Sequence, residues 1–366
     1  MMWMEKVKLS DICSPKQWKT IPTSDLLNEG YPVYGANGII GYYNEYNHEN
    51  PVVTVTCRGA TCGSINITVP KAYVTGNAMC LDDLKNDIEI EYLYYCLKHY
   101  DFKNVISGSA QPQITRQGMD KIYIMLCSRE EQRDIVNKLK KTEKVIKLRK
   151  QELQLLDDLA KARFVEMFGD PVSNPYGYDK VALSDLADIK IGPFGSLLHK
   201  EDYIVGGHPL LNPYHIVDGR ISPDNKLTIS DEKYKELSAY QLKTGDVVMG
   251  RRGEMGRCAV VSEEGFLCGT GSILIRTKGD VTADYIQKTI SFPSFKKTIE
   301  DMAVGQTMPN LNVPIVSSFE IIKPPIEVQD RYYALVEQVD KSKVEIQKAL
   351  NKTQMLFDSL MQEYFG

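Results

Sequence analysis

The sequence predicts an α+β protein of two duplicated mixed α/β domains, each followed by a long helix, the two helices pairing as an antiparallel coiled coil. Three observations predict this fold. The segment 128–169 has no proline and no glycine before its last residue, and its Leu, Lys, Glu, Gln and Ala content favours one continuous helix. The segment recurs 197 positions later, so that Gln132 matches Gln329 and Phe168 matches Phe365. Apolar residues recur in both copies at alternating steps of three and four.

These apolar residues form a narrow seam along each helix. The predicted seam consists of Ile135, Leu139, Ile146, Leu153, Leu156, Val336, Val339, Ile346, Leu350, Phe357 and Leu360. A helix of about 40 residues is about 60 Å long, and a seam of that length at this spacing is typical of paired helices. Its burial contributes on the order of 20 kcal/mol before conformational entropy is subtracted. The alternative is that each helix packs only onto the domain that precedes it.

The repeat divides the chain into domains and helices. We expect a first domain at 1–127, a first helix at 128–170, a linker at 171–180, a second domain at 181–325 and a second helix at 326–366. Ser128 and Glu131 have the spacing of a capping box, which predicts the start of the first helix. Gly169 and Pro171 predict its end.

Composition is that of an ordinary globular protein. The chain has 366 residues, 43% of them hydrophobic and 25% charged, with a net charge of -4 that neither supports nor excludes nucleic-acid binding. No run of eighteen apolar residues and no secretory leader follow Met1, so we expect no membrane contact and a cytoplasmic location. The eight cysteines lack C-x-x-C spacing, which predicts reduced, mostly buried thiols and no metal site.

A glycine-punctuated turn occurs once in each domain. The strand-like segment 52–57 runs into Arg58-Gly59, and 246–250 runs into Arg251-Arg252-Gly253. We expect Gly59 and Gly253 to turn the backbone sharply. Two interpretations of the arginines are open. They contact DNA phosphates or bases, or they belong to a plain β-hairpin in which they are solvated or paired with acids.

The ordered, duplicated motifs resemble those of one family. The motifs are YPVYGANGIIGY at 31–42, R-G-x-x-x-G at 58–63, R-G-x-x-G at 252–256, SGSAQPQIT at 107–115, and E-x-Q at 130–132 and 327–329. Together they resemble the specificity subunits of type I restriction-modification systems over essentially the whole chain. The first helix departs from the pattern, because Ile124-Met-Leu-Cys127 replaces the proline-rich link found at Pro324-Pro325.

The resemblance implies a non-catalytic subunit that recognises double-stranded DNA. Each domain would be a target-recognition domain for one half of a bipartite sequence. The coiled coil would set the spacing and dock two modification (methyltransferase) subunits along its seam, with restriction/translocase subunits in the full complex. S-adenosylmethionine, ATP and magnesium are expected in the partner subunits, and no cofactor in this chain. The candidate DNA-binding residues are Asn37, Arg58, Gly59, Gln111, Arg116, Arg251, Arg252 and Arg257.

The residues themselves also argue against catalysis. The chain contains no G-x-G-x-x-G, Walker, H-E-x-x-H or G-x-S-x-G motif. Asn174-Pro-Tyr176 and Asn212-Pro-Tyr214 resemble the Asn-Pro-Pro-Tyr loop of adenine methyltransferases, but both lack the second proline, and we expect turns there. The alternative function is a coiled-coil adaptor or scaffold that reads no specific DNA. An adaptor would not explain why two domains differ in sequence within one duplicated frame.

Overall fold

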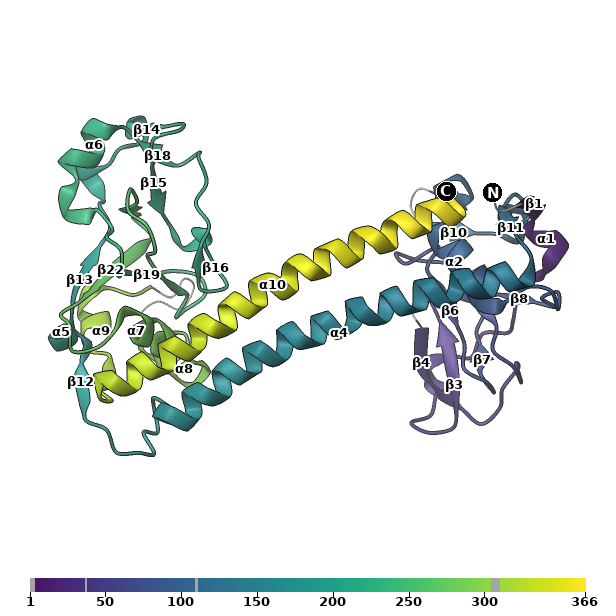
Figure 1. The fold of residues 1–366 in the computed structure, drawn as a ribbon, viewed down its shortest axis with the longest axis horizontal. Coiled ribbons are helices and arrows are strands. Elements are labelled where there is room, and N and C mark those ends of the chain that lie inside the picture. Colours follow the sequence, from purple (N-terminus) through teal and green to yellow (C-terminus); the bar gives the residue numbers. More distant parts are fainter. Residues whose placement is uncertain (1–3, 37, 109–110, 304–309) are drawn as a thin grey trace. The chain divides into compact units, whose positions relative to one another are not determined.

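The computed structural model describes residues 4–36, 38–108, 111–303 and 310–366 and divides into two compact units. Unit 1 comprises Met1–Leu153 and Glu345–Gly366, and unit 2 comprises Gln154–Val344. The long helices are α4 (Arg129–Phe168) and α10 (Ile326–Phe365), and each contributes to both units (Figure 1). The domain limits drawn from the repeat stay predictions, because the packing units divide both helices.

Unit 1 is built around a four-stranded antiparallel sheet of order β2-β8-β5-β6. A three-stranded sheet β4-β3-β7 and the pairs β1-β11 and β10-β9 accompany it. The strands are β1 (Glu5–Lys8), β2 (Ser14–Gln17), β3 (Tyr31–Gly35), β4 (Gly38–Tyr43), β5 (Val53–Thr56), β6 (Ile65–Ile67), β7 (Tyr73–Val74), β8 (Ala78–Asp82), β9 (Ile106–Ser107), β10 (Gln113–Ile114) and β11 (Tyr123–Leu126). The short helices are α1 (Leu9–Ile12), α2 (Ile90–His99) and α3 (Arg116–Met119).

Unit 2 repeats this plan with a sheet of order β13-β22-β19-β20. A second sheet has the order β14-β18-β15-β21, and β12-β23 and β16-β17 are pairs. The strands are β12 (Lys180–Ala182), β13 (Ala187–Ile191), β14 (Tyr203–Ile204), β15 (His208–Leu211), β16 (Ile216–Val217), β17 (Arg220–Ile221), β18 (Thr228–Ile229), β19 (Val247–Gly250), β20 (Cys258–Val260), β21 (Leu267–Cys268), β22 (Ser272–Thr277) and β23 (Glu320–Ile322). The short helices are α5 (Leu183–Leu186), α6 (Asp231–Glu236), α7 (Ala283–Ile290), α8 (Pro293–Met302) and α9 (Val313–Ser317).

The central strand of each main sheet is covered on both faces. Every residue of β5 and of β19 is buried, and both strands are rich in β-branched residues that suit a pleated, enclosed surface. Helix α2 packs on β5 and β6, and α7 packs on β19 and β20. Tyr92 and Tyr285, both fully buried, lie in the corresponding cores. The two units therefore use the same core plan with different side chains.

The cysteines agree with the prediction of reduced, mostly buried thiols. All eight are free, and only Cys62 is partly exposed. Burial raises the pKa of the Cys13 and Cys258 thiols to about 12, so both stay protonated at neutral pH. Within the described residues, the structure contains no helix long and apolar enough to cross a membrane.

The two long helices run antiparallel in each unit. In unit 1, Lys138 Nζ donates to Tyr364 Oη at 3.4 Å, and Arg149 donates to the Ala349 carbonyl and to Thr353 Oγ1. In unit 2, Tyr332 Oη donates to the Ala160 carbonyl at 3.2 Å, and Lys343 pairs with Asp157. Residue numbers fall along α10 as they rise along α4, which confirms the predicted antiparallel pairing.

The predicted seam residues all lie on covered helix faces. Ile135, Leu139, Ile146, Val339, Leu350 and Phe357 are buried, and Leu153, Leu156, Val336, Ile346 and Leu360 are half-buried. Near its carboxyl end the buried face of α4 includes Phe164 and Phe168 as well. Both rings pack against Tyr285 and Tyr332 of unit 2, so the helix serves a domain core there in addition to the helix pair.

The start of each long helix is tied to its domain by a buried glutamine. Ser128 and Glu131 form the predicted capping box at α4, with reciprocal bonds of 3.0 and 3.4 Å. One turn later, Gln132 accepts from the Glu89 amide and donates to the Cys127 carbonyl, each at 2.9 Å. Gln329 makes the same two bonds, to the Thr282 amide and the Pro324 carbonyl, also at 2.9 Å.

Candidate nucleic-acid interface

In each unit, the loop that carries the arginine follows the carboxyl end of a central strand of the main sheet. The antiparallel register places Thr56 at the end of β5 opposite Ala78 at the start of β8. In unit 2, Gly250 at the end of β19 lies opposite Ser272 at the start of β22, and Ile191 at the end of β13 pairs with Ile273. In each unit, loops that lie far apart in sequence therefore meet at the same end of the strands.

Arg58 and Arg252 occupy the same place in the two folds. Arg58 forms an isolated antiparallel bridge with Gln113, and Arg252 forms one with Asn310. The flanking backbone bonds repeat as well, because the Ile114 amide donates to the Cys57 carbonyl at 3.0 Å and the Leu311 amide to the Arg251 carbonyl at 2.9 Å. Both arginines are exposed. Backbone hydrogen bonds thus hold each arginine in place, while its side chain is exposed to solvent.

Gly59 and Gly253 allow the turn after each arginine. Their φ angles are +88° and +81°, in the region that favours glycine, and a Cβ at either position would meet no atom within 4 Å. The requirement for glycine is therefore conformational, as predicted. The Gly59 amide donates to the Pro112 carbonyl at 3.3 Å, which fastens the turn to the segment before β10.

The second unit adds one arginine that the first lacks. Cys57 is fully buried, whereas Arg251 at the matching position is half-buried and donates through Nε to Asn310 Oδ1 at 3.0 Å. Arg252 Nε reaches the same oxygen at 3.4 Å. Burial and the neighbouring Arg252 charge lower the pKa of Arg251. Two like charges that share one neutral amide form a surface that favours an anion such as a DNA phosphate.

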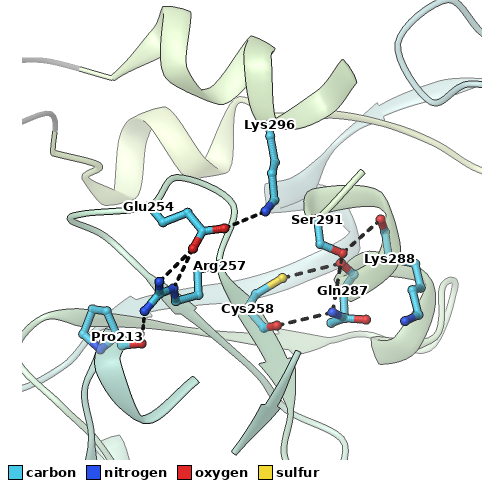
Figure 2. A network of polar contacts seen from close by, with 8 residues as sticks. All are labelled: Pro213, Glu254, Arg257, Cys258, Gln287, Lys288, Ser291 and Lys296. Atoms are coloured by element: carbon cyan, nitrogen blue, oxygen red, sulfur yellow. Dashed lines mark hydrogen bonds and ion pairs between the residues drawn. The ribbon is translucent and has the colours of Figure 1, made fainter. Parts of the chain in front are cut away.

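Arg257 differs from the other candidates because its charge is compensated within the protein. Its Nη2 and Nε lie 2.7 and 3.2 Å from Glu254 Oε2, and its Nη1 donates to the Pro213 carbonyl at 3.3 Å (Figure 2). Lys296 Nζ binds the other Glu254 oxygen at 2.9 Å. Hydrogen bonds from Arg257 and Lys296 lower the pKa of Glu254 to about 2. This network stabilises the turn. At Arg257 the structure therefore fits the interpretation in which the arginine is paired with an acid.

The remaining candidates lie in unit 1. Gln111 is exposed beside Pro112, and Arg116 is the exposed first residue of α3. Asn37 lies outside the described residues, as does the segment 304–309 that precedes Asn310.

The expected Asn-Pro-Tyr turns are present. Pro213–His215 forms a single 3-10 turn, and bonded turns occupy residues 171–173 and 175–176. In these turns Asn212 Oδ1 accepts from the Gly271 amide, and the Asn174 side chain binds the Tyr178 backbone.

One group of possible metal ligands was missed from the sequence. His48, Cys80 and Asp82 have ligand atoms within 4.8 Å of one another. His48 Nε2 lies 2.9 Å from Asp82 Oδ1, and Trp18 Nε1 donates to Asp82 Oδ2 at 3.1 Å. His48 Nδ1 lies 2.6 Å from Asn47 Oδ1. His48 and Asp82 therefore have hydrogen-bond partners within the protein, and their arrangement is that of a hydrogen-bond network. No spacing in the sequence could have indicated it, since His48 and Asp82 come from different segments.

Comparison with known proteins gives a consistent result. A family model described as the type I restriction modification DNA specificity domain matches residues 2–157 and 175–353. The specificity subunit of type I restriction enzyme MjaVIII from Methanocaldococcus jannaschii is 20% identical over 323 residues, covering 80% of this chain and 75% of that protein. The specificity subunit of type I restriction enzyme MjaIX from the same organism is 23% identical over 304 residues, covering 76% and 68%.

A solved structure shares the fold over the whole chain. The S subunit of a type I restriction-modification system from M. genitalium aligns with a TM-score of 0.65 at 15% identity, covering 100% of this chain and 96% of that one. At this identity the likeness concerns the fold.

Proposed function

The chain belongs to the type I restriction-modification DNA specificity family, and from this premise we propose that each of its two domains reads one half of a bipartite DNA target. The observation that carries the proposal is the duplicated bridge of Arg58 with Gln113 and of Arg252 with Asn310. The same exposed cation follows the central strand of the main sheet in both units. A coiled-coil scaffold would not need this feature in either domain.

The expected chemistry at these turns is that of DNA contact. Arginine contacts phosphates, and it can also bind the O6 and N7 acceptors of guanine in the major groove. The difference between Cys57 and Arg251 gives the two turns different donor sets, which is consistent with two different half-sites. The subunit itself would supply recognition and no catalysis.

The proposal includes partners that would carry out the reaction. Two modification subunits would dock along the α4–α10 pair and methylate adenine in each half of the target, with restriction/translocase subunits completing the assembly in the cytoplasm. S-adenosylmethionine, ATP and magnesium would be bound by those partners. The helix pair would set the number of unspecified bases between the half-sites.

A methylation map tests the proposal. The chain is expressed with its modification subunit in a host that lacks adenine methylation, and methylated adenines are mapped across the genome. We expect one bipartite motif that disappears when the chain is omitted. Arg58→Ala should relax or abolish one half of the motif and Arg252→Ala the other. Lys71→Ala, which removes an exposed lysine of unit 1 paired with Glu49, is the control and should leave both halves unchanged. Methylation that does not depend on the chain would refute the proposal.

A further inference from the structure

Residues 212–215 in unit 2 form a rigid turn beside the arginine pair. Pro213 packs against Gly250, the last residue of β19, and against Gly271, which precedes β22. A Cβ added to Gly250 or Gly271 would lie 3.1 or 3.0 Å from the Pro213 ring. The Arg251 amide donates to the Gly271 carbonyl at 3.0 Å. The turn, the end of β19 and Arg251 therefore lie next to one another.

Several hydrogen bonds hold this turn in one conformation. The Gly271 amide donates to Asn212 Oδ1 at 3.1 Å, and the Asn212 amide donates to His215 Nδ1 at 3.1 Å. The His215 amide in turn donates to the Asn212 carbonyl at 2.9 Å. From the opposite side, Arg257 Nη1 donates to the Pro213 carbonyl (Figure 2). A surface turn held by this many hydrogen bonds has a fixed backbone, so the Cα of the residue at its tip is fixed as well.

Tyr214 is the side chain at the tip of this turn. It is 50% exposed, although its neighbour His215 is 1% exposed. The two rings are in contact, with centroids 3.9 Å apart. The buried histidine therefore packs against the tyrosine ring, and Tyr214 keeps half of its surface in solvent. An exposed aromatic ring with a hydroxyl, held in this way, suits contact with a partner that has both apolar and hydrogen-bonding groups.

The strand that precedes this turn has a counterpart in the first unit. β3 pairs in parallel with β7 through Val33 and Tyr73, and β15 pairs in parallel with β21 through Leu210 and Leu267. Four residues after Val33 the sequence has Asn37, and four residues after Leu210 it has Tyr214. The preceding carbonyls are held alike, since Thr61 Oγ1 donates to the Ala36 carbonyl at 3.2 Å as Arg257 does to that of Pro213. The two domains thus have different residues, asparagine and tyrosine, at corresponding positions of the sequence.

We propose that Tyr214 contacts the bases of the DNA half-site read by the second domain, and that Arg257 is a positioning residue that holds the Pro213 carbonyl and so the turn that carries Tyr214. The inference rests on the proposed function and adds to it a specificity residue that lies outside the arginine-bearing turns. Aromatic rings contact base faces and the thymine methyl group, and a phenol hydroxyl can donate to or accept from a base edge. Arg251 and Arg252 would then contact the same half-site from the neighbouring turn.

The test uses the complete complex and reads the two half-sites separately. Tyr214→Ala and Tyr214→Asn, the second introducing the residue that the first domain has at position 37, are expressed with the modification subunit, and methylated adenines are mapped. We expect discrimination at one or more positions of the second half-site to fall by about tenfold or more, while the first half-site is unchanged. Tyr176→Ala is the control, because Tyr176 is 53% exposed in the same unit and lies in the segment after α4. It should leave the motif as it is in the wild type.

The outcomes separate this inference from the proposed function. A wild-type bipartite motif that every methylating Tyr214 variant leaves unchanged overturns the inference and leaves the proposed function standing. A change confined to the first half-site overturns it as well. If neither variant methylates, binding of the purified complexes to wild-type target DNA decides: loss of specific binding with retained binding to random DNA supports the inference, and wild-type binding overturns it. Arg257→Lys should produce a partial form of the Tyr214→Ala change, because lysine cannot bind Glu254 and the Pro213 carbonyl with one planar group.

Discussion

The ring of Tyr92 lies edge-on to the ring of Phe365, with centroids 5.4 Å apart and planes inclined by 65°. The ring of Tyr285 lies against that of Phe168 in the same way, at 5.0 Å and 64°. Phe168 and Phe365 end the two long helices, and Tyr92 and Tyr285 lie in α2 and α7. In each unit, the end of one long helix is thus anchored to the domain from which the other long helix starts.

Phe168→Ala should destabilise unit 2 by about 3–5 kcal/mol, because it removes a fully buried ring and leaves a cavity among Phe164, Tyr285 and Tyr332. Urea unfolding followed by tyrosine fluorescence measures the change. Val165→Ala, on the exposed side of the same turn, should change the free energy of unfolding by no more than about 0.5 kcal/mol. A similar small effect for Phe168→Ala would show that the aromatic anchor does not stabilise the fold.

Gln329→Ala should cost about 1–3 kcal/mol, because it leaves the Thr282 amide and the Pro324 carbonyl without the bonds that Gln329 makes to them. Gln132→Ala should do the same to the Glu89 amide in unit 1. The matched control is Gln338→Ala, an exposed position of α10. Thermal unfolding monitored by circular dichroism compares the three variants, and equal midpoints for Gln329→Ala and Gln338→Ala would contradict the assigned role.

Glu254→Gln should lower stability in a pH-dependent way. The folded pKa of Glu254 is about 2, below its ordinary value of 4.5, so the ionised form stabilises the fold above about pH 4.5. This contribution is lost as pH falls from about 4.5 towards 2. The difference in unfolding midpoint between wild type and Glu254→Gln should therefore be constant from pH 5 to 8 and shrink between pH 4.5 and 3. A difference that grows on acidification would show that the carboxylate is not stabilised by Arg257 and Lys296.

Arg252→Ala should weaken binding to the specific target more than binding to random DNA, by about 1–3 kcal/mol if the guanidinium reads a base edge. Fluorescence anisotropy at several salt concentrations measures both affinities for the assembled complex. Equal losses on the two DNAs, with a salt slope reduced by about 0.9, would instead identify a phosphate contact. Arg220→Ala removes a surface pair with Asp340 and serves as the control. If Arg252→Ala loses no affinity for either DNA, the turn has a structural role only.

Insertion of seven residues after Leu153 and after Leu350 together should lengthen the unspecified spacer of the methylated motif. Seven residues keep the heptad register of both helices and add about 10 Å, close to three base pairs at about 3.4 Å each. The same insertion in one helix alone should mismatch the seams and prevent assembly. A double insertion that still methylates at the original spacing would show that the helices do not determine it.

The sequence by itself determined the duplicated plan, the two long helices and their antiparallel pairing. These features follow from local rules: seam residues such as Leu139 and Leu350 recur at a helical period, Ser128 and Glu131 satisfy a helix start within four residues, and Gly59 and Gly253 mark turns that need positive φ. The repeat aligned Gln132 with Gln329 but gave no reason for a glutamine there, since the backbone amides that donate to them lie more than 40 residues away in sequence.

Only the tertiary structure decided which polar side chains meet. Arg252 and Asn310 are 58 residues apart and Arg257 and Pro213 are 44 apart, and only the packing of distant loops brings them together. The same packing separated Arg257, which is paired with the Glu254 carboxylate, from Arg58 and Arg252, which stay exposed. Tyr214 drew attention in the sequence only as part of a turn. The conformation of its turn depends on hydrogen bonds from Arg257 and from the Gly271 amide, and bonds between distant segments leave no periodic signal in a single chain.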